Sequence, residues 1–166
     1  MKLEPIDHPF TPPLSLQNHL KKYPLEYGSN GREDWQWKAD TLGWRILENA
    51  QAQEIGFVWL TSTAENPRHK DLLLAVYDPY KNHGYGNSAL NFIESQVQDL
   101  SVEKIRCQVN SNRVETGLIV RKWLNRRGFK VYNRDPNPRW ISLSDDEYLC
   151  KCYNPVYFFK DYSKNN

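Results

Sequence analysis

The fold of this chain is constrained above all by the apolar run Asp71-Leu-Leu-Leu-Ala-Val-Tyr77. A loop with two glycines and then an amphipathic segment follow this run. A short continuous apolar run between a polar loop and Pro79 predicts a central strand buried on both faces. Helical spacing after Gly86 predicts a helix to Leu100 with one apolar stripe, made of Ala89, Leu90, Ile93, Val97 and Leu100. A buried strand therefore ends in a glycine loop that opens a helix.

Periodic segments on both sides of this unit complete the predicted fold. The patterns predict further strands at Trp35–Lys38, Trp44–Glu48, Ile55–Leu60, Lys104–Val109, Phe129–Asn133 and Trp140–Tyr153. They predict a helix at Leu14–Tyr23, within an otherwise irregular, proline-interrupted lead-in over residues 1–30. They predict a second helix at Arg113–Arg127, ended by Gly128. A strand–helix–strand crossover makes the two central strands parallel, and the flanking hairpins make the sheet mixed. The predicted class is α/β (α+β), a mixed, largely antiparallel sheet with a central parallel strand pair and helices packed on it.

The composition indicates one folded domain over residues 1–166. Aromatic residues are 13% of the chain, and large rings bury much area per residue. A net charge of +2 excludes an extended polybasic surface. Cys107, Cys150 and Cys152 indicate neither a disulfide framework nor a metal site, and Cys150 and Cys152 are expected in the core. No secretory or membrane-spanning segment is recognisable, so we expect a cytoplasmic protein without membrane contact.

The loop at Gly84-Tyr-Gly86 has the residue types of a pyrophosphate cradle. Two glycines allow close approach to a ligand, and the first turn of a helix offers N–H groups and the positive end of its dipole. Lys81 adds a cation, and His83, Asn87 and Ser88 add possible donors. A dinucleotide-binding motif is opposed by the long link from the strand and by Asn110 where an acidic residue is expected. A tight turn without a ligand is the remaining alternative.

The segment Leu74-Ala-Val-Tyr-Asp-Pro-Tyr-Lys-Asn-His-Gly-Tyr-Gly-Asn-Ser-Ala-Leu90 resembles the acetyl-CoA signature of the GNAT-type N-acetyltransferases. Val76, Lys81, Gly84 and Gly86 fall at the spacing of that signature, and Arg127-Gly128-Phe129 resembles the family's closing element. The resemblance implies acetyl-CoA as acyl donor and direct attack by an acceptor amine on its thioester. It also implies that the pantetheine arm binds backbone at Leu74, Ala75 and Val76. The implied pyrophosphate site comprises Lys81, Asn82, His83, Gly84, Tyr85, Gly86, Asn87 and Ser88. Asn112, a further cofactor-binding candidate, is a loose match to the asparagine that often opens the family's later helix.

The chain departs from the family's pattern at three positions. Lys81 replaces the usual Arg or Gln, which keeps a cation but loses the bidentate fork. Leu124 stands where the family often has a tyrosine acid, and Lys70 stands where it often has a base. Asp71 and Tyr132 are the replacement catalytic candidates, and each has a structural alternative: a polar strand end for Asp71, a core or cross-strand ring for Tyr132. Asn112 has one too, as a helix N-cap.

The acceptor is the least specified part of the sequence. Residues 1–40 match the family only as a variable substrate-side region, and Trp35, Trp37 and Trp44 are candidates for a flat acceptor site or for the core. Asp145-Asp146-Glu147 either attracts a cationic amine or forms a solvated hairpin turn. The basic residues Arg121, Lys122, Arg126 and Arg127 indicate a solvated helix face, and nucleic acid is not expected as a partner.

The sequence as a whole predicts an acetyl-CoA-dependent N-acetyltransferase that acetylates a primary amine of a small molecule or peptide. The alternative is a non-catalytic GNAT-fold module that binds coenzyme A or a protein partner, which the departures at Leu124 and Lys70 leave open. Either a monomer or a homodimer is compatible with the sequence.

Overall fold

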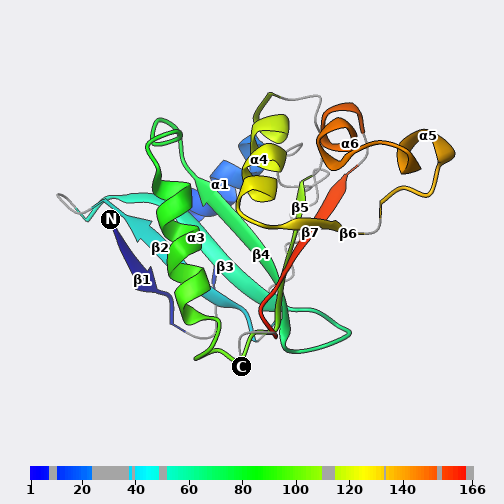
Figure 1. The fold of residues 1–166 in the computed structure, drawn as a ribbon. Helices are drawn as coiled ribbons and strands as arrows, with labels where there is room; N and C mark the ends of the chain where they lie inside the picture. The colour runs from blue at the N-terminus through cyan, green and yellow to red at the C-terminus, as the bar shows by residue number, and fades with distance from the viewer. Residues whose placement is uncertain are drawn as a thin grey trace. The chain divides into compact units, whose positions relative to one another are not determined.

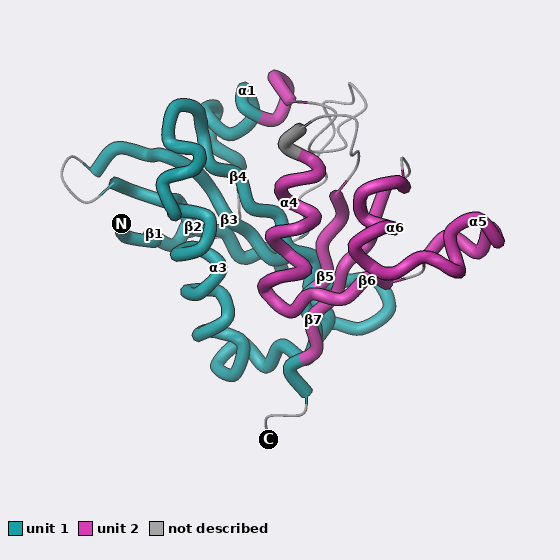
Figure 2. The backbone as a smooth tube through the Cα atoms, turned by 45° about the horizontal axis from the view of Figure 1, so that its top comes forward, with its two compact units in different colours: residues 1–19, 36–105, 162–166 teal, residues 20–35, 106–161 magenta. Residues whose placement is uncertain are grey.

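The computed structural model describes residues 1–7, 11–23, 38, 40–48, 52–109, 115–132, 134–152 and 155–163. Of the predicted strand Trp35–Lys38, only Lys38 is described. The candidates Trp37 and Asn112 lie outside the described residues. The chain divides into two compact units (Figure 2). One comprises residues 1–19, 36–105 and 162–166, and the other comprises residues 20–35 and 106–161.

Seven strands form one sheet in the hydrogen-bonded order β1-β2-β3-β4-β5-β7-β6 (Figure 1). They are β1 (Lys2–Pro5), β2 (Leu42–Leu47), β3 (Glu54–Ser62), β4 (His69–Val76), β5 (Lys104–Val109), β6 (Lys130–Tyr132) and β7 (Val156–Asp161). The described helices are α1 (Leu14–Lys22), α3 (Tyr85–Gln96), α4 (Glu115–Arg126), α5 (Pro138–Ile141) and α6 (Asp145–Lys151). The sheet is mostly antiparallel with β4 and β5 as its parallel pair, which confirms the predicted fold class.

In the first unit, β2, β3 and β4 form an antiparallel meander whose pairing aligns Val58 with Leu74 and Phe57 with Ala75. Helix α3 lies across one face of β1 to β4 (Figure 1). There Ala89 packs with Ile46 and Ile55. The predicted apolar stripe is confirmed for Ala89, Leu90, Ile93 and Val97, which are all buried. The helix ends at Gln96 instead of the predicted Leu100, and Leu100 is half-buried. Strand β4 is a correction: only Ala75 is buried along it, and its other side chains are half-buried.

Strand β1 corrects the prediction of a wholly irregular lead-in. It pairs antiparallel with β2, with Leu3 opposite Ile46 and Pro5 opposite Trp44. Four residues that include a proline give no alternating pattern, and proline is tolerated at the edge of a sheet because it needs no ladder donor there. The strand therefore depends on its partner more than on its own sequence.

In the second unit, the end of α4 is built as the sequence predicts. Gly128 has φ +83°, a left-handed conformation that L side chains rarely adopt. The N–H of Phe129 donates to the carbonyl of Leu124 at 3.1 Å, and that of Gly128 donates to the carbonyl of Asn125 at 3.0 Å. These bonds satisfy carbonyls of the last turn and direct the chain into β6.

The predicted strand over Trp140–Tyr153 is wrong, because α5 and α6 occupy most of that segment. The carboxamide of Asn137 accepts from the N–H of Arg139 and caps α5. Ser144 and Glu147 form a capping box at the start of α6, in which each side chain accepts from the other residue's N–H. The hydrogen bonds from Ser144 lower the pKa of Glu147, so this contribution to stability is present above the ordinary carboxyl pKa and is lost as pH falls through the lowered one.

Three further expectations for the second unit are corrected by the structure. Cys150 is exposed on α6 and only Cys152 is buried, which corrects the prediction of two core thiols. Arg121 is fully buried, so the helix face around it is not wholly solvated as predicted. No strand is predicted beyond Tyr153, yet β7 lies there and pairs antiparallel with β6, with Tyr132 opposite Tyr157.

Removing the cap of α6 has a measurable expected cost. Ser144→Ala deletes the side chain that accepts from the N–H of Glu147 at 3.3 Å, and loss of such a cap costs about 1 kcal/mol. We expect urea denaturation to show that decrease in the free energy of unfolding. Ser142→Ala, an exposed serine just past α5, is the control and should change it by less than about 0.5 kcal/mol. Equal effects of the two substitutions would contradict the capping assignment.

Candidate functional site

The loop from Tyr77 to Gly84 connects β4 to α3, and the N-terminus of α3 has no side-chain cap. Gly84 is the N-cap of α3 and makes no side-chain capping bond. The first backbone bond of the helix runs from the N–H of Ser88 to the carbonyl of Gly84 at 3.1 Å, so the N–H groups of Tyr85 and Gly86 precede it. Gly84, Asn87 and Ser88 are exposed at this end of the helix. Such a terminus attracts an anion through its amides and its dipole.

The two glycines of the loop are required for different reasons. Gly84 has φ +83°, so the fold itself requires glycine there. At Gly86 no positive φ occurs, and an added Cβ would lie 3.9 Å from Leu74 Cδ2, an ordinary van der Waals distance. Neither backbone strain nor packing explains that second glycine. Absence of a side chain at this position lets a ligand approach the first-turn amides closely.

The predicted cation of the loop is present and is held by the loop itself. Lys81 Nζ lies 3.1 Å from Asp78 Oδ1, with 31% of the lysine side chain exposed. Asn82 follows in a left-handed conformation with φ 66°, and His83 Nδ1 lies 2.8 Å from the carbonyl oxygen of Lys81. An incoming phosphate therefore meets Lys81 already paired with a carboxylate, so its net gain from that cation is smaller than from an unpaired one.

The predicted pantetheine-binding residues lie in the last part of β4, directly before this loop. Leu74, Ala75 and Val76 pair with Val58, Phe57 and Gly56 of β3. Leu74 and Val76 pack against the core cluster beneath α3, whereas Ala75 is fully buried. Strand end, loop and helix N-terminus thus belong to one unit and follow one another directly in the chain.

The two catalytic candidates belong to different units. Asp71 is half-buried on β4, opposite Thr61 of β3. Tyr132 on β6 is 42% exposed and its ring contacts Phe159 edge-on, with centroids 5.8 Å apart. Tyr132 is therefore a cross-strand surface ring within its unit.

Lys70 stands at the position where the family often has a base, and Leu124 at the position where it often has an acid, and both have structural roles here. Lys70 Nζ donates to Ser62 Oγ at 2.6 Å and lies 3.7 Å from Asp40 Oδ2. Hydrogen bonding by Ser62 and the charge of Lys70 lower the pKa of Asp40, so this cluster holds a cation and an anion together. Leu124 is buried with 3% exposure. Nothing in the sequence around Ser62 or Asp40 signals this cluster.

The acceptor candidates are mostly accounted for by the fold. Trp44 is buried and contacts Phe92 of α3 edge-on at 5.9 Å, so it belongs to the core. Asp145 and Glu147 lie in the first turn of α6, where Asp145 is bonded to Arg134 and Glu147 completes the cap. Trp35 and Trp37 lie outside the described residues. Among the described residues no three His, Cys, Asp or Glu side chains are grouped to bind a metal ion. In the same ranges no helix is long and apolar enough to cross a bilayer.

Comparison with known proteins gives no match to a protein-family model and none to a curated protein sequence. The fold, however, matches solved structures. A spermidine N-acetyltransferase variant from Vibrio cholerae has a TM-score of 0.64 at 13% identity, over 97% of this chain and 95% of that one. A GNAT family acetyltransferase from Elizabethkingia anophelis with acetyl-CoA bound has a TM-score of 0.63 at 15% identity, over 97% of both chains.

A third structure, an acetyltransferase from Bacillus subtilis in complex with CoA, has a TM-score of 0.62 at 15% identity and covers 97% of this chain and 99% of that one. At these identities the similarity establishes the fold. The chain has the fold of the GNAT acetyltransferases, as the motif around Gly84 and Gly86 implies.

Proposed function

We propose that the protein is an acetyl-CoA-dependent N-acetyltransferase whose cofactor pyrophosphate binds at the N-terminus of α3. The observation that carries this proposal is the open first turn of α3 beside Gly86, a glycine that neither φ nor packing explains. The order of the sheet supports it, as do two similar folds whose structures contain CoA or acetyl-CoA.

In this proposal each part of the loop has a defined task. The amides of Tyr85 and Gly86 donate to the pyrophosphate, and Lys81 supplies a cation near it. Backbone at Leu74, Ala75 and Val76 aligns the pantetheine arm, with Asn82, His83, Asn87, Ser88 and Asn112 as further contacts. Bound acetyl-CoA supplies the thioester that an amine attacks directly. The protein's contribution is orientation of the two reactants and the handling of one proton.

We place the acceptor amine in the class of primary amines of small molecules or peptides. The fold of a spermidine N-acetyltransferase supports a small-molecule amine. Asp71 is the proposed base, as a half-buried carboxylate on the strand of the cofactor site, and Tyr132 is the proposed acid to the leaving thiolate. Residues 1–166 are proposed as a single domain acting in the cytoplasm, as a monomer or homodimer.

A second function is favoured by the cluster around Lys70. Lys70 Nζ is already engaged as a donor to Ser62 and as the partner of Asp40, and Leu124 has no proton to give to a thiolate. Both observations fit a module with the GNAT fold that binds coenzyme A without efficient transfer.

Two assays on the intact chain separate these functions. Calorimetric titration with acetyl-CoA and with desulfo-CoA measures binding, and release of free thiol over a panel of polyamines, lysine peptides and aminoglycosides measures transfer. We expect both binding and amine-dependent thiol release, with Asp71→Asn reducing release by about 100-fold at unchanged acetyl-CoA affinity. Binding without release on any amine supports the non-catalytic module. Absence of coenzyme A binding contradicts both functions.

A further inference from the structure

The cofactor loop contains backbone conformations that residues with side chains rarely adopt. Asn82 and Gly84 both have positive φ, and Gly86 has no side chain to pack. Ordering a free loop upon binding costs conformational entropy, so a loop that is already held binds its ligand more tightly. The structure provides two tyrosine–glutamate hydrogen bonds, one at each end of this loop.

The first bond joins the start of α3 to the end of β2. Tyr85, between the two glycines, donates from its hydroxyl to Glu48 Oε1 at 3.0 Å. Its ring packs against the cluster of Ile46, Ile55 and Ala89. Glu48 is itself fixed, because its N–H donates to the carbonyl of Gln53 at 2.9 Å across the β2–β3 connection. The position of the Tyr85 backbone therefore depends on a strand 37 residues away in the chain.

The ring of Tyr85 passes this constraint on to the loop. His83 stacks on Tyr85 with ring centroids 6.3 Å apart and an interplanar angle of 29°. His83 Nδ1 in turn lies 2.8 Å from the carbonyl oxygen of Lys81. A continuous set of contacts thus runs from Glu48 through Tyr85 and His83 to the backbone of Lys81.

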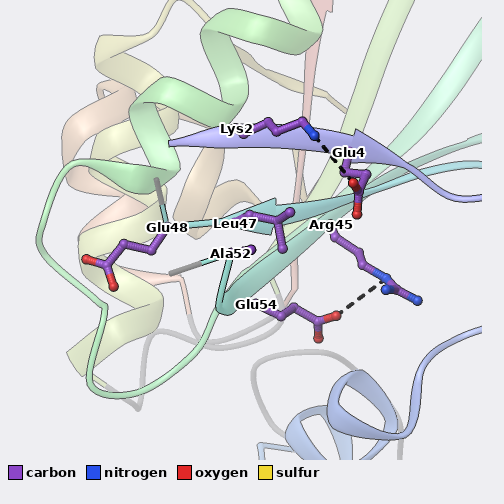
Figure 3. Close-up of a pocket in the computed structure, with 7 residues that line it drawn as sticks. All are labelled: Lys2, Glu4, Arg45, Leu47, Glu48, Ala52 and Glu54. Carbon is purple, nitrogen blue, oxygen red and sulfur yellow. Dashed lines mark hydrogen bonds and ion pairs between the residues drawn. The ribbon is translucent and has the colours of Figure 1, made fainter. Parts of the chain in front are cut away.

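The second bond holds the other end of the loop, where β4 ends. Tyr77 donates to Glu54 Oε1 at 2.9 Å, and its ring contacts that of His19 at 4.9 Å. Glu54 also accepts from Ser15 Oγ at 2.5 Å and lies 3.6 Å from Arg45 Nε. Figure 3 shows Glu54 and Arg45 pointing toward each other, whereas Glu48 points away from both. All three residues line a cavity of about 270 Å³. The two carboxylates therefore act on separate ends of the loop.

We propose that Glu48 is a positioning residue for the cofactor site, acting through Tyr85 to hold the first-turn amides of α3 in their binding arrangement. The second bond, from Tyr77 to Glu54, fixes the beginning of the same loop. This inference rests on the proposed coenzyme A site and adds to it Glu48 and Glu54, two residues of the β2–β3 hairpin.

Four variants and a double variant test the proposal by calorimetric titration with coenzyme A. Tyr85→Phe keeps the ring and its stacking on His83 but removes the hydroxyl, and we expect affinity to fall about three- to tenfold. Glu48→Ala removes the acceptor, and Glu48→Gln removes the negative charge but keeps an acceptor oxygen. Comparing Ala with Gln at Glu48 isolates the hydrogen bond from any repulsion between a carboxylate and the pyrophosphate. Tyr157→Phe, an exposed tyrosine on β7, is the matched control and should bind as wild type does.

The double variant Tyr85→Phe/Glu48→Ala provides the readout that a purely structural role would not move. We expect its coenzyme A affinity to equal that of Glu48→Ala, because the phenol then has no partner left to lose. An unchanged affinity of Tyr85→Phe, or the same loss with and without Glu48, would overturn the proposal while wild type still binds. Failure of wild type to bind coenzyme A would instead overturn the proposed function.

Discussion

Gly86→Val is expected to abolish measurable coenzyme A binding while leaving the fold intact. An ideal Cβ at residue 86 lies 3.9 Å from Leu74 Cδ2, an ordinary van der Waals distance, so a side chain can begin there without a clash. In the proposed complex that space is beside the amides that hold the pyrophosphate. Loss of two or more hydrogen bonds to a charged group corresponds to a decrease in affinity of about 100-fold or more.

Stability and binding have to be measured together for this variant. Its thermal midpoint should stay within about 3 °C of wild type, because glycine is already unfavourable inside a helix and its replacement removes that cost. Ser95→Val, at an exposed position of the same helix, is the control for a branched residue and should leave affinity unchanged. If Gly86→Val binds coenzyme A like wild type, the pyrophosphate does not lie at this turn.

Arg121→Met is expected to cause the largest loss of stability among the substitutions considered. The guanidinium is fully buried, and its Nη1 donates to the carbonyl of Cys152 at 2.6 Å and to that of Leu149 at 3.2 Å. It thereby satisfies carbonyls at the C-terminal end of α6, within the same unit. Burial lowers the pKa of Arg121, and the carbonyls compensate for part of the cost of burying a cation. Methionine fills much of the volume but leaves those acceptors buried without this donor.

We expect Arg121→Met to lower the free energy of unfolding in urea by about 2–4 kcal/mol. Lys122→Met, at the next position of α4, removes a cation from an exposed site and is expected to change it by less than about 0.5 kcal/mol. Similar small effects of both substitutions would show that Arg121 does not hold the end of α6.

The parts of the fold that the sequence predicts are those whose pattern is local. Strand β5 coincides with the predicted Lys104–Val109, and α4 ends where Gly128 indicates, because alternation and a left-handed glycine are decided by neighbouring residues. The glycine loop was predictable for the same reason, since its residues are consecutive. Strand β1 is different: its pairing with β2 is a contact with residues about forty positions later.

The helices α5 and α6 were predictable in principle. Ser144 followed three residues later by Glu147 is a capping-box signature, and Asn137-Pro138 is a common helix start. Alternation alone over Trp140–Tyr153 predicts a strand instead. The buried contact of Arg121 with the end of α6 and the bond between Tyr85 and Glu48 leave no local signal. Both join distant segments through single side chains.

The proposed function requires coenzyme A to bind through the first-turn amides of α3. Backbone amide chemical shifts of the ¹⁵N-labelled protein, recorded during titration with coenzyme A, test this claim most directly. We expect the amides of Tyr85 and Gly86 to show the largest changes, to saturate at one ligand per chain, and to respond in the same way to acetyl-CoA. Saturable shifts confined to other parts of the chain, or no saturable shift at all, would contradict the claim.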